Sequence, residues 1–382
     1  MAQKAFLAAG VGGTHLEAAV VDERARIVWR KALPSPCGGA LMEEARRAPD
    51  RIAFTLERWN EFVPHRDRLL DATAALLVEA RQEADAIGCA ALSAGVGVAG
   101  AVNPLTGDIA GKTGALNHPA WGDFNPARQL EERTGLPIVC LNDAKAMALG
   151  ALATLDSAAV VFVGEEDDAG QTPRESDLPE ALRAITDFVE IDPGTGLGGA
   201  YIVDKKVWYG PDPARPDPDV GEIWHLEPDP ERPGVRFEEM VSGRAIGDRV
   251  IDSLRALGDR RVEALIEQKG TKIQDLLSAG HEAVRAVIGT VLADAGRNLA
   301  RGISHIAGCE QKRLGAPTIE TFVIGGGLVS GKSEESTFVR AALDRAIRAF
   351  FAGSEWNPTV LFTTLGGRAL LIGAASAAQK VC

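Results

Sequence analysis

The sequence predicts an α/β protein made of two related halves. Short apolar, β-branched segments that suit buried strands alternate along the chain with longer segments of helical periodicity. A strand, a glycine-rich turn and a second strand occur at residues 6–21 and again at 188–203. Such a recurrence indicates an internal duplication. The two glycine-rich turns then become equivalent positions in the two halves.

Size and charge restrict the class of protein. A chain of 382 residues suggests two or three domains with a sizeable core. Apolar residues make up 46% and charged residues 25%, an ordinary balance for a globular protein. The net charge of -12 argues against a protein that coats nucleic acid, because such a protein needs a basic face. It leaves an anionic small-molecule substrate open.

The lack of a recognisable targeting signal and the spacing of the cysteines favour a cytoplasmic location. No run of about 18 apolar residues occurs, so no membrane span is expected. The N-terminal apolar run continues into a strand and turn, unlike a signal peptide. The scattered cysteines show no CxxC spacing and indicate reduced thiols. These cysteines are Cys37, Cys89, Cys140, Cys309 and Cys382.

In the first half, strands are expected at 6–9, 16–21, 90–98 and 138–141, and helices at 66–86, 126–134 and 144–152. Residues 34–66, with prolines and mixed charge, are expected to be irregular. The turn at 10–14 (GVGGT) lets backbone N–H groups approach a phosphate, and Thr14 adds a hydroxyl. Tight hairpins also use glycine without binding anything.

Asn142 and Asp143 lie where a predicted strand meets a predicted helix. Open α/β sheets bind ligands beyond the carboxyl ends of their strands, so both side chains are candidates for a site. An Asp there can accept a proton from a bound hydroxyl. The alternative is that one of them only caps the helix.

In the second half, strands are expected at 158–163, 188–191, 200–203, 321–324 and 359–363. Helices are expected at 237–250 with an interruption at Ser242-Gly243, and at 259–268, 272–278, 281–305, 337–351 and 369–379. The acidic stretch 164–187 is expected to be a surface loop or insertion. The glycines at 325–327 follow a strand and either admit a phosphate or flat ring, or form a structural turn.

The order of motifs resembles the ROK family of sugar kinases. The resemblance covers nearly the whole chain. The matching segments are GGT at 12–14, GVAG at 97–100, NHPAW at 117–121, LPIVCLNDAKAMALG at 136–150, GTGLGG at 194–199, GEIWH at 221–225, EEMVSGRAI at 238–246, IGGG at 324–327 and LGGRALLIGAA at 365–375. It implies a two-domain, actin-like or hexokinase-type ATPase fold with duplicated ribonuclease H-like domains.

The resemblance also implies roles for individual residues. Asp143 would be the general base that deprotonates the acceptor hydroxyl. The substrate-binding residues would be Gly97, Asn117, Asn142, Glu222, His225 and Glu238. The residues that hold ATP would be Gly12, Gly13, Thr14, Gly194, Thr195, Gly196, Gly325, Gly326 and Gly327. Two alternatives stay open: His225 as a buried core histidine, and one of Glu238 and Glu239 as a solvated helix residue.

Three departures from the family pattern stand out. The family usually has an acidic residue two positions before Gly-Gly-Thr that helps to organise Mg²⁺, and here that position is Gly10. The segment 228–237, where the family often has a zinc loop, contains no Cys, so no structural zinc is expected. Trp224 stands where a small residue is usual, which should reshape the pocket beside His225.

The sequence therefore predicts ATP- and Mg²⁺-dependent phosphorylation of a hexose or hexose-like cyclic polyol, a C7 cyclitol or an amino sugar included. The smaller domain would comprise 1–117 plus 367–382, and the larger one 118–366. A cytoplasmic homodimer is expected, with no nucleic-acid or membrane partner. One rival is a non-catalytic sugar-binding pseudokinase or regulator, which Gly10 favours. A second rival is an ATPase or acyl-phosphate kinase. The polyol-binding set disfavours it, because an anionic substrate would need Arg or Lys at those positions. The acceptor and the hydroxyl modified stay open.

Overall fold

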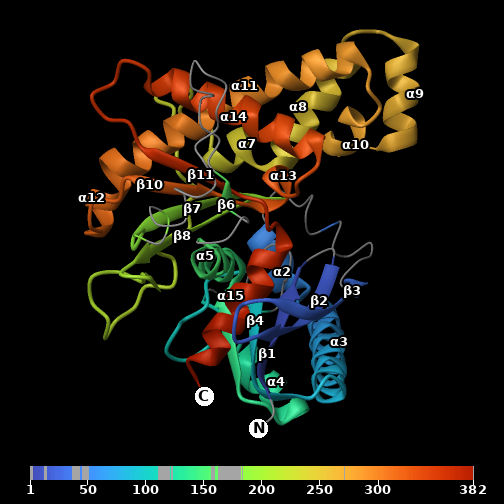
Figure 1. The fold of residues 1–382 in the computed structure, drawn as a ribbon, viewed down its shortest axis with the longest axis vertical. Helices are drawn as coiled ribbons and strands as arrows, with labels where there is room; N and C mark the ends of the chain where they lie inside the picture. The colour runs from blue at the N-terminus through green and yellow to red at the C-terminus, as the bar shows by residue number, and fades with distance from the viewer. Residues whose placement is uncertain are drawn as a thin grey trace. The chain divides into compact units, whose positions relative to one another are not determined.

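A computed structural model describes residues 3–12, 15–36, 44, 51–110, 121, 124–155, 160–161, 182, 184–270 and 272–381. The chain divides into two compact units, which are described separately (Figure 1). Unit 1 comprises Met1–Thr154, Asp212–Val220 and Gly367–Cys382, and unit 2 comprises Leu155–Pro211 and Gly221–Gly366. The boundary expected at 117/118 falls inside unit 1, because the strand at 138–142 joins the first sheet.

Unit 1 is built on a five-stranded sheet in the order β3-β2-β1-β4-β5. The strands are β1 (Gln3–Val11), β2 (His15–Asp22), β3 (Ile27–Pro34), β4 (Cys89–Val98) and β5 (Ile138–Asn142). The β1–β2 and β2–β3 pairs are antiparallel, whereas β4 runs parallel to both β1 and β5. The carboxyl ends of β1, β4 and β5 consequently share one edge of the sheet.

Helices cover both faces of this sheet. They are α2 (Arg51–Glu57), α3 (Trp59–Ala86), α4 (Pro126–Thr134), α5 (Asp143–Ala153) and α15 (Gly367–Gln379). Side chains alternate along β1: Leu7 belongs to the apolar cluster beneath α3, and Ala8 to the cluster beneath α15. Because both faces are buried, the strand is a continuous apolar run instead of an alternating one.

Close packing of α5 on α15 fixes the position of α5 (Figure 1). A Cβ added to Gly150 would lie 1.9 Å from the carbonyl oxygen of Ala369, and one added to Gly373 would lie 1.7 Å from that of Ala146. Only glycine fits such backbone contacts. The N-terminus of α5, where Asp143 lies, is therefore held firmly against the sheet.

Unit 2 contains a six-stranded sheet in the order β6-β11-β10-β7-β8-β9. The strands are β6 (Val160–Val161), β7 (Phe188–Pro193), β8 (Leu197–Val203), β9 (Lys206–Val207), β10 (Thr321–Ile324) and β11 (Thr359–Thr363). β10 runs parallel to β7 and β11, and β7–β8 is the second glycine-turn hairpin. The carboxyl ends of β7, β10 and β11 again share an edge.

The helices of unit 2 are α7 (Phe237–Val241), α8 (Gly243–Arg255), α9 (Arg260–Lys269), α10 (Ile273–Leu277), α11 (Glu282–His305), the π-helical turn η1 (Ile306–Glu310), α12 (Gln311–Leu314), α13 (Gly326–Val329) and α14 (Glu334–Phe351). The interruption expected at Ser242-Gly243 is confirmed. Ser242 ends α7, and its hydroxyl caps α8 by accepting from the Ala245 N–H at 3.2 Å.

The expectation that 34–66 is irregular is wrong for residues 51–66, which form α2 and the beginning of α3. Phe62 is fully buried there, with Phe54, Trp59 and Val63 packed around it. This apolar cluster outweighs the cost of Pro64 inside α3. The edge strand β3 was also not expected. Among the described residues, no helix has the length and apolar character needed to cross a membrane.

Candidate functional site

In unit 1, the predicted site residues gather at the shared edge of β1, β4 and β5. Gly97 of β4 lies beside Gly10 of β1 on one side and Leu141 of β5 on the other. Gly12 follows β1, while Asn142 and Asp143 follow Leu141. Parallel strands therefore bring residues from three distant parts of the sequence to one place.

Asn142 is the N-cap of α5. Its Oδ1 accepts a hydrogen bond from the Lys145 N–H at 3.1 Å, and its Nδ2 donates to the carbonyl oxygen of Gly100 at 3.0 Å. Asn142 therefore caps the helix, and its role in substrate binding stays a prediction. Asp143 is the first residue of the helix instead of its cap, and it is partly exposed.

The surroundings of Asp143 raise the pKa of its carboxyl group. Burial raises its pKa above the ordinary value, and this outweighs the opposing effects of the Ala144 N–H and the charge of Lys145. The Ala144 N–H donates to Oδ1 at 2.9 Å and fixes the orientation of the carboxylate. A raised pKa makes Asp143 a stronger base near neutral pH than an ordinary Asp.

Lys145 is a feature of this site that the motif analysis missed. Its side chain is fully buried, and Nζ donates to the carbonyl oxygen of Pro218 at 2.7 Å. This contact ties the Pro/Asp-rich segment 212–220 to the helix that carries Asp143. A single Lys inside the apolar helix AKAMALGAL is the only signal in the sequence, and it does not identify the partner.

In unit 2, two glycine turns lie at the ends of adjacent parallel strands. Gly194 follows β7 and Gly325 follows β10, and the Gly325 N–H donates to the carbonyl oxygen of Ile191 at 2.9 Å. Gly326 has φ +80, and a Cβ there would lie 2.1 Å from Oδ1 of Asp192. The second turn is therefore packed against β7 and requires glycine. Thr195, between the two glycines of the first turn, is exposed.

Glu238 contacts the first of these turns. Its Oε2 accepts from the Leu197 N–H at 3.0 Å, and a Cβ on Gly196 would lie 2.6 Å from the same oxygen. The neighbouring Glu239 is exposed, and its Oε2 accepts from the Arg236 N–H at 2.8 Å at the start of α7. Of the two carboxylates, Glu239 is the solvated helix residue and Glu238 the one at the turn.

The GEIWH segment lies beside α7. The Glu238 N–H donates to the carbonyl oxygen of Trp224 at 3.2 Å, and Glu222 is half-buried. His225 is exposed, which contradicts the alternative of a buried core histidine. Its ring packs edge-to-face on Trp224 with centroids 5.4 Å apart, and Arg236 lies over the Trp224 ring at 5.5 Å. Trp224 therefore contacts His225 directly, and a reshaped pocket stays a prediction.

A second missed residue is Glu190 on β7. Its side chain is fully buried, and neither carboxylate oxygen has a hydrogen-bond partner in the described part of the chain. A Cβ on Gly325 would lie 2.7 Å from Oε1, so the carboxyl group lies directly beneath the second glycine turn. Burial, with a contribution from the charge of Asp192, raises the pKa of Glu190 well above its ordinary value. Acidic residues at alternate positions of an apolar strand (VEID) could have identified this pair.

The segment 228–237, where the resemblance would place a zinc loop, is held by charges. Asp229 is buried, and its Oδ2 accepts from Arg232 Nε at 2.7 Å. Arg232 also donates to Oδ1 of Asn298 on α11 at 2.9 Å. Across the described residues, no group of three or more His, Cys, Asp or Glu side chains is placed to hold a metal ion. The absence of structural zinc stays a prediction.

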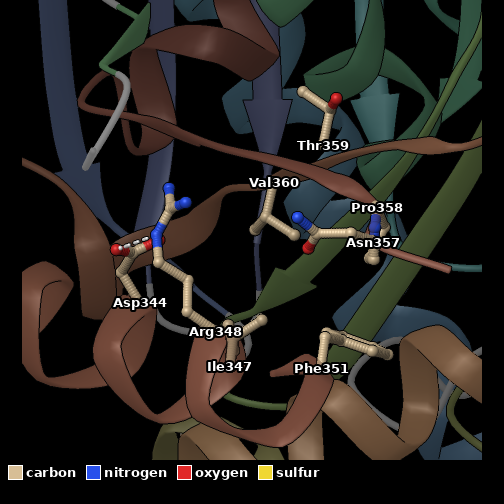
Figure 2. Close-up of a pocket in the computed structure, with 8 residues that line it drawn as sticks. All are labelled: Asp344, Ile347, Arg348, Phe351, Asn357, Pro358, Thr359 and Val360. Carbon is tan, nitrogen blue, oxygen red and sulfur yellow. Dashed lines mark hydrogen bonds and ion pairs between the residues drawn. The ribbon is translucent and has the colours of Figure 1, made fainter. Parts of the chain in front are cut away.

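A cavity of about 170 Å³ lies elsewhere in unit 2, between α14 and the beginning of β11 (Figure 2). Arg348 and Asp344, which form an ion pair at 2.7 Å, line it together with Phe351 and Thr359. Because Thr359 begins β11, the cavity is at the amino end of that strand. The glycine turns lie at the carboxyl ends, so the cavity is not part of the candidate site.

The structure thus groups Gly12, Gly97, Asn142 and Asp143 in unit 1. In unit 2, both glycine turns, Glu238 and the GEIWH segment lie near one another. Gly13, Thr14 and Asn117 lie outside the described residues, and their roles stay predictions.

The chain is similar in sequence to known sugar kinases. No protein-family model matches the chain. It is 26% identical to a glucokinase of Streptomyces coelicolor over 383 aligned positions, which cover 97% of this chain and 96% of the relative. It is 28% identical to an N-acetylmannosamine kinase of Salmonella newport over 257 positions, 65% of each chain.

Solved structures show the fold. A ROK family glucokinase from Streptomyces griseus in complex with glucose and AMPPNP superposes with a TM-score of 0.66 at 22% identity, covering 98% of this chain and 99% of that one. A ROK hexokinase from Thermus thermophilus gives a TM-score of 0.58 at 22% identity, with 99% and 98% covered. The predicted two-domain α/β fold of the hexokinase type is confirmed. Together with the sequence relatives, these structures confirm the resemblance to ROK family sugar kinases that the ordered motifs predict.

Proposed function

We propose that this protein transfers the γ-phosphoryl group of ATP to a hydroxyl of a hexose or hexose-like cyclic polyol. The observation that carries the proposal is Asp143: a partly exposed carboxylate with a raised pKa, fixed at the end of a parallel strand. The similarity to a glucokinase and an N-acetylmannosamine kinase supports the same activity.

Asp143 would act as the general base. The acceptor hydroxyl loses its proton to the carboxylate as its oxygen forms a bond to the γ-phosphorus, and the bond from that phosphorus to the ADP oxygen breaks. A general base of this kind contributes roughly 10²–10⁴-fold to the rate. The close packing of α5 on α15 supports this role, because it holds the carboxylate in one orientation.

The glycine turns would hold the phosphates of ATP. Gly12, Gly194, Gly196 and Gly327 carry no side chain that would keep a phosphate from the backbone N–H groups, and Thr195 offers an exposed hydroxyl. Mg²⁺, when bound, neutralises phosphate charge during the transfer. Gly13 and Thr14 complete this set by resemblance only.

Asn142, Glu222, His225 and Glu238 would bind the acceptor hydroxyls, with Gly97 and Asn117. Carboxylates and an amide can accept from, or donate to, vicinal hydroxyls. The exposed pair of Trp224 and His225 adds an aromatic surface that suits an acceptor larger than glucose, such as an amino sugar or a C7 cyclitol.

Purified protein would be incubated with ATP, Mg²⁺ and a panel of hexoses, amino sugars and cyclitols, with ADP formation followed and the product identified by mass spectrometry. The proposal predicts acceptor-dependent ADP release that Asp143→Asn abolishes and Glu239→Gln leaves unchanged. If Asp143→Asn retained full activity, the general-base role would be wrong.

The second candidate function is a sugar-binding pseudokinase or regulator. Gly10 favours it, as does the similarity to a solved ROK family transcriptional regulator with a TM-score of 0.56 at 17% identity. It predicts sugar binding by calorimetry without ADP release at any Mg²⁺ concentration.

We further propose a cytoplasmic homodimer with no nucleic-acid or membrane partner. Light scattering on the purified protein tests the dimer, because a monomeric mass at micromolar concentration contradicts it.

A further inference from the structure

The carboxylate of Glu17 lies next to Gly10, which has no side chain of its own. Gly10 of β1 is paired with Glu17 of β2. A Cβ added to Gly10 would lie 3.3 Å from Cγ and 3.5 Å from Oε1 of Glu17. The Glu17 side chain therefore lies directly beside the place where a side chain at position 10 would begin.

The carboxylate of Glu17 is held in place from one side only. Oε2 accepts from Arg30 Nε at 3.0 Å and from its Nη2 at 2.5 Å. Oε1 accepts no hydrogen bond within the described part of the chain, and a Cβ on Gly367 would lie 3.2 Å from it. The Glu17 side chain is only 14% exposed, so Arg30 fixes the carboxylate while Oε1 lies over glycine backbone.

Glycine backbone and an apolar side chain form a cradle beside Oε1 among the described residues. Gly10 and Gly97 lie side by side on β1 and β4, and the apolar Leu370 of α15 closes on both, 2.9 Å from the Cβ position of either. A side chain on Gly10 or Gly367 would crowd the carboxylate. This cradle is at the carboxyl end of β1, directly before Gly12 of the first glycine turn.

We propose that Glu17 replaces the missing acidic residue at position 10 and holds the hydrated Mg²⁺ that accompanies the nucleotide. This rests on the proposed kinase function. Mg²⁺ usually keeps several waters and binds proteins through one or two carboxylates together with substrate phosphates. One fixed carboxylate oxygen is enough for that mode. Arg30 is a positioning residue that holds the carboxylate of Glu17 in one orientation.

The test measures two affinities: that of the protein for nucleotide with and without metal, and that of the protein–nucleotide complex for metal. Calorimetry gives the affinity for ADP with Mg²⁺ and with EDTA, and electron paramagnetic resonance gives Mn²⁺ affinity in the ADP complex. Glu17→Gln, which keeps the shape of the side chain, should weaken Mn²⁺ binding roughly 10–100-fold. Binding of metal-free ADP should stay within about twofold, since the glycine turns are unchanged. Glu79→Gln is the matched control, because Glu79 is a carboxylate on the same unit that pairs with Lys31 at 2.7 Å away from the cradle.

A rescue variant separates this role from a structural one. Glu17→Ala should lose Mn²⁺ affinity, and Gly10→Asp/Glu17→Ala should regain most of it. Removal of the long Glu17 side chain opens one side of position 10, and on the other side only the methyl end of the flexible Leu370 side chain has to turn away. Full Mn²⁺ affinity in Glu17→Gln would overturn the proposal. So would an equal loss of metal-free ADP binding, or a double variant that folds without rescue. Absence of nucleotide binding by the unaltered protein under all conditions would instead overturn the kinase function itself.

Discussion

The two glycine-turn hairpins, β1–β2 in unit 1 and β7–β8 in unit 2, are both antiparallel strand pairs. They differ in the surroundings of the carboxylate that each one carries. Glu17 on the first is partly exposed and paired with Arg30. Glu190 on the second is fully buried, has no hydrogen-bond partner among the described residues, and lies near another acidic side chain. Arg30 donates two hydrogen bonds to the carboxylate of Glu17, whereas burial raises the pKa of Glu190 well above its ordinary value. The same supersecondary unit thus carries a carboxylate held by an arginine in unit 1 and, in unit 2, a buried carboxylate without a hydrogen-bond partner among the described residues.

The largest expected effect concerns unit 1, which carries Asp143 and Glu17. Asp143→Asn should lower kcat by roughly 10²–10⁴-fold, because it removes the proton acceptor. Steady-state kinetics measure this, with thermal melting as the check on folding. In the unaltered protein, kcat/KM should rise with pH through the raised pKa of Asp143, since only the deprotonated carboxylate is a base. A flat profile at acidic pH would contradict this assignment.

The adjacent acidic residues on α7 offer the next comparison. Glu238→Gln should lower kcat/KM for the acceptor about 10–100-fold, the usual cost of losing a hydrogen bond to a charged group. Glu239→Gln should leave kcat/KM unchanged, because Glu239 only accepts from the Arg236 N–H. Equal effects of the two substitutions would show that Glu238 does not touch the acceptor.

The two glycine turns of unit 2 differ in the room around them. Gly326→Ala should destabilise the fold by roughly 1–3 kcal/mol, because its φ of +80 and the contact with Asp192 exclude a side chain. Gly194→Ala is the matched control: the nearest atom to its added Cβ is 4.0 Å away. Chemical unfolding of both variants measures the difference, and equal stabilities would mean that the second turn tolerates a side chain.

The smallest effect concerns the buried acid. The pKa of Glu190 is raised in the folded state, so folding binds its proton more tightly than the unfolded chain does. Its contribution to stability is complete below the ordinary Glu pKa and is lost as pH rises towards the raised value. Glu190→Gln cannot lose a proton and should therefore show a higher Tm than the unaltered protein above neutral pH, by a few degrees.

Below the ordinary Glu pKa the two proteins should melt alike. Glu79→Gln, at a half-buried carboxylate that pairs with Lys31, controls for the loss of one charge. A Tm difference that does not depend on pH would mean that the substitution acts through packing instead of proton binding.

Elements with clear local signals were predictable residue for residue. Helix α4 is one example, because Asn125 caps its beginning and Gly135, at φ +66, ends it. The strands β10 and β11 are others, as apolar runs bounded by polar residues. Helix α2 and the beginning of α3 were missed, because Pro64 and mixed charge obscured the apolar spacing around Phe62. The exposed edge strand β3 carries too many charges to show a buried face.

The motifs indicated Asp143, Glu238 and the glycine turns as candidates, because these residues stand in recognisable local sequences. They could not identify tertiary partners. The contact of Lys145 with Pro218 joins residues 73 positions apart, and the proximity of Glu17 to Gly10 depends on the register of two strands. The buried carboxyl of Glu190 was visible as a pattern, but its meaning depends on Gly325 arriving from β10.

Charged and polar side chains hold the segment 228–237 in place. Asp229, Arg232 and Asn298 join this loop to α11 through charged and polar side chains. The hydrogen bond from Arg232 lowers the pKa of Asp229, so the stabilisation is present at neutral pH and is lost only as pH falls through that lowered pKa. Strong acid should therefore loosen the loop from α11, whereas mild acid should not.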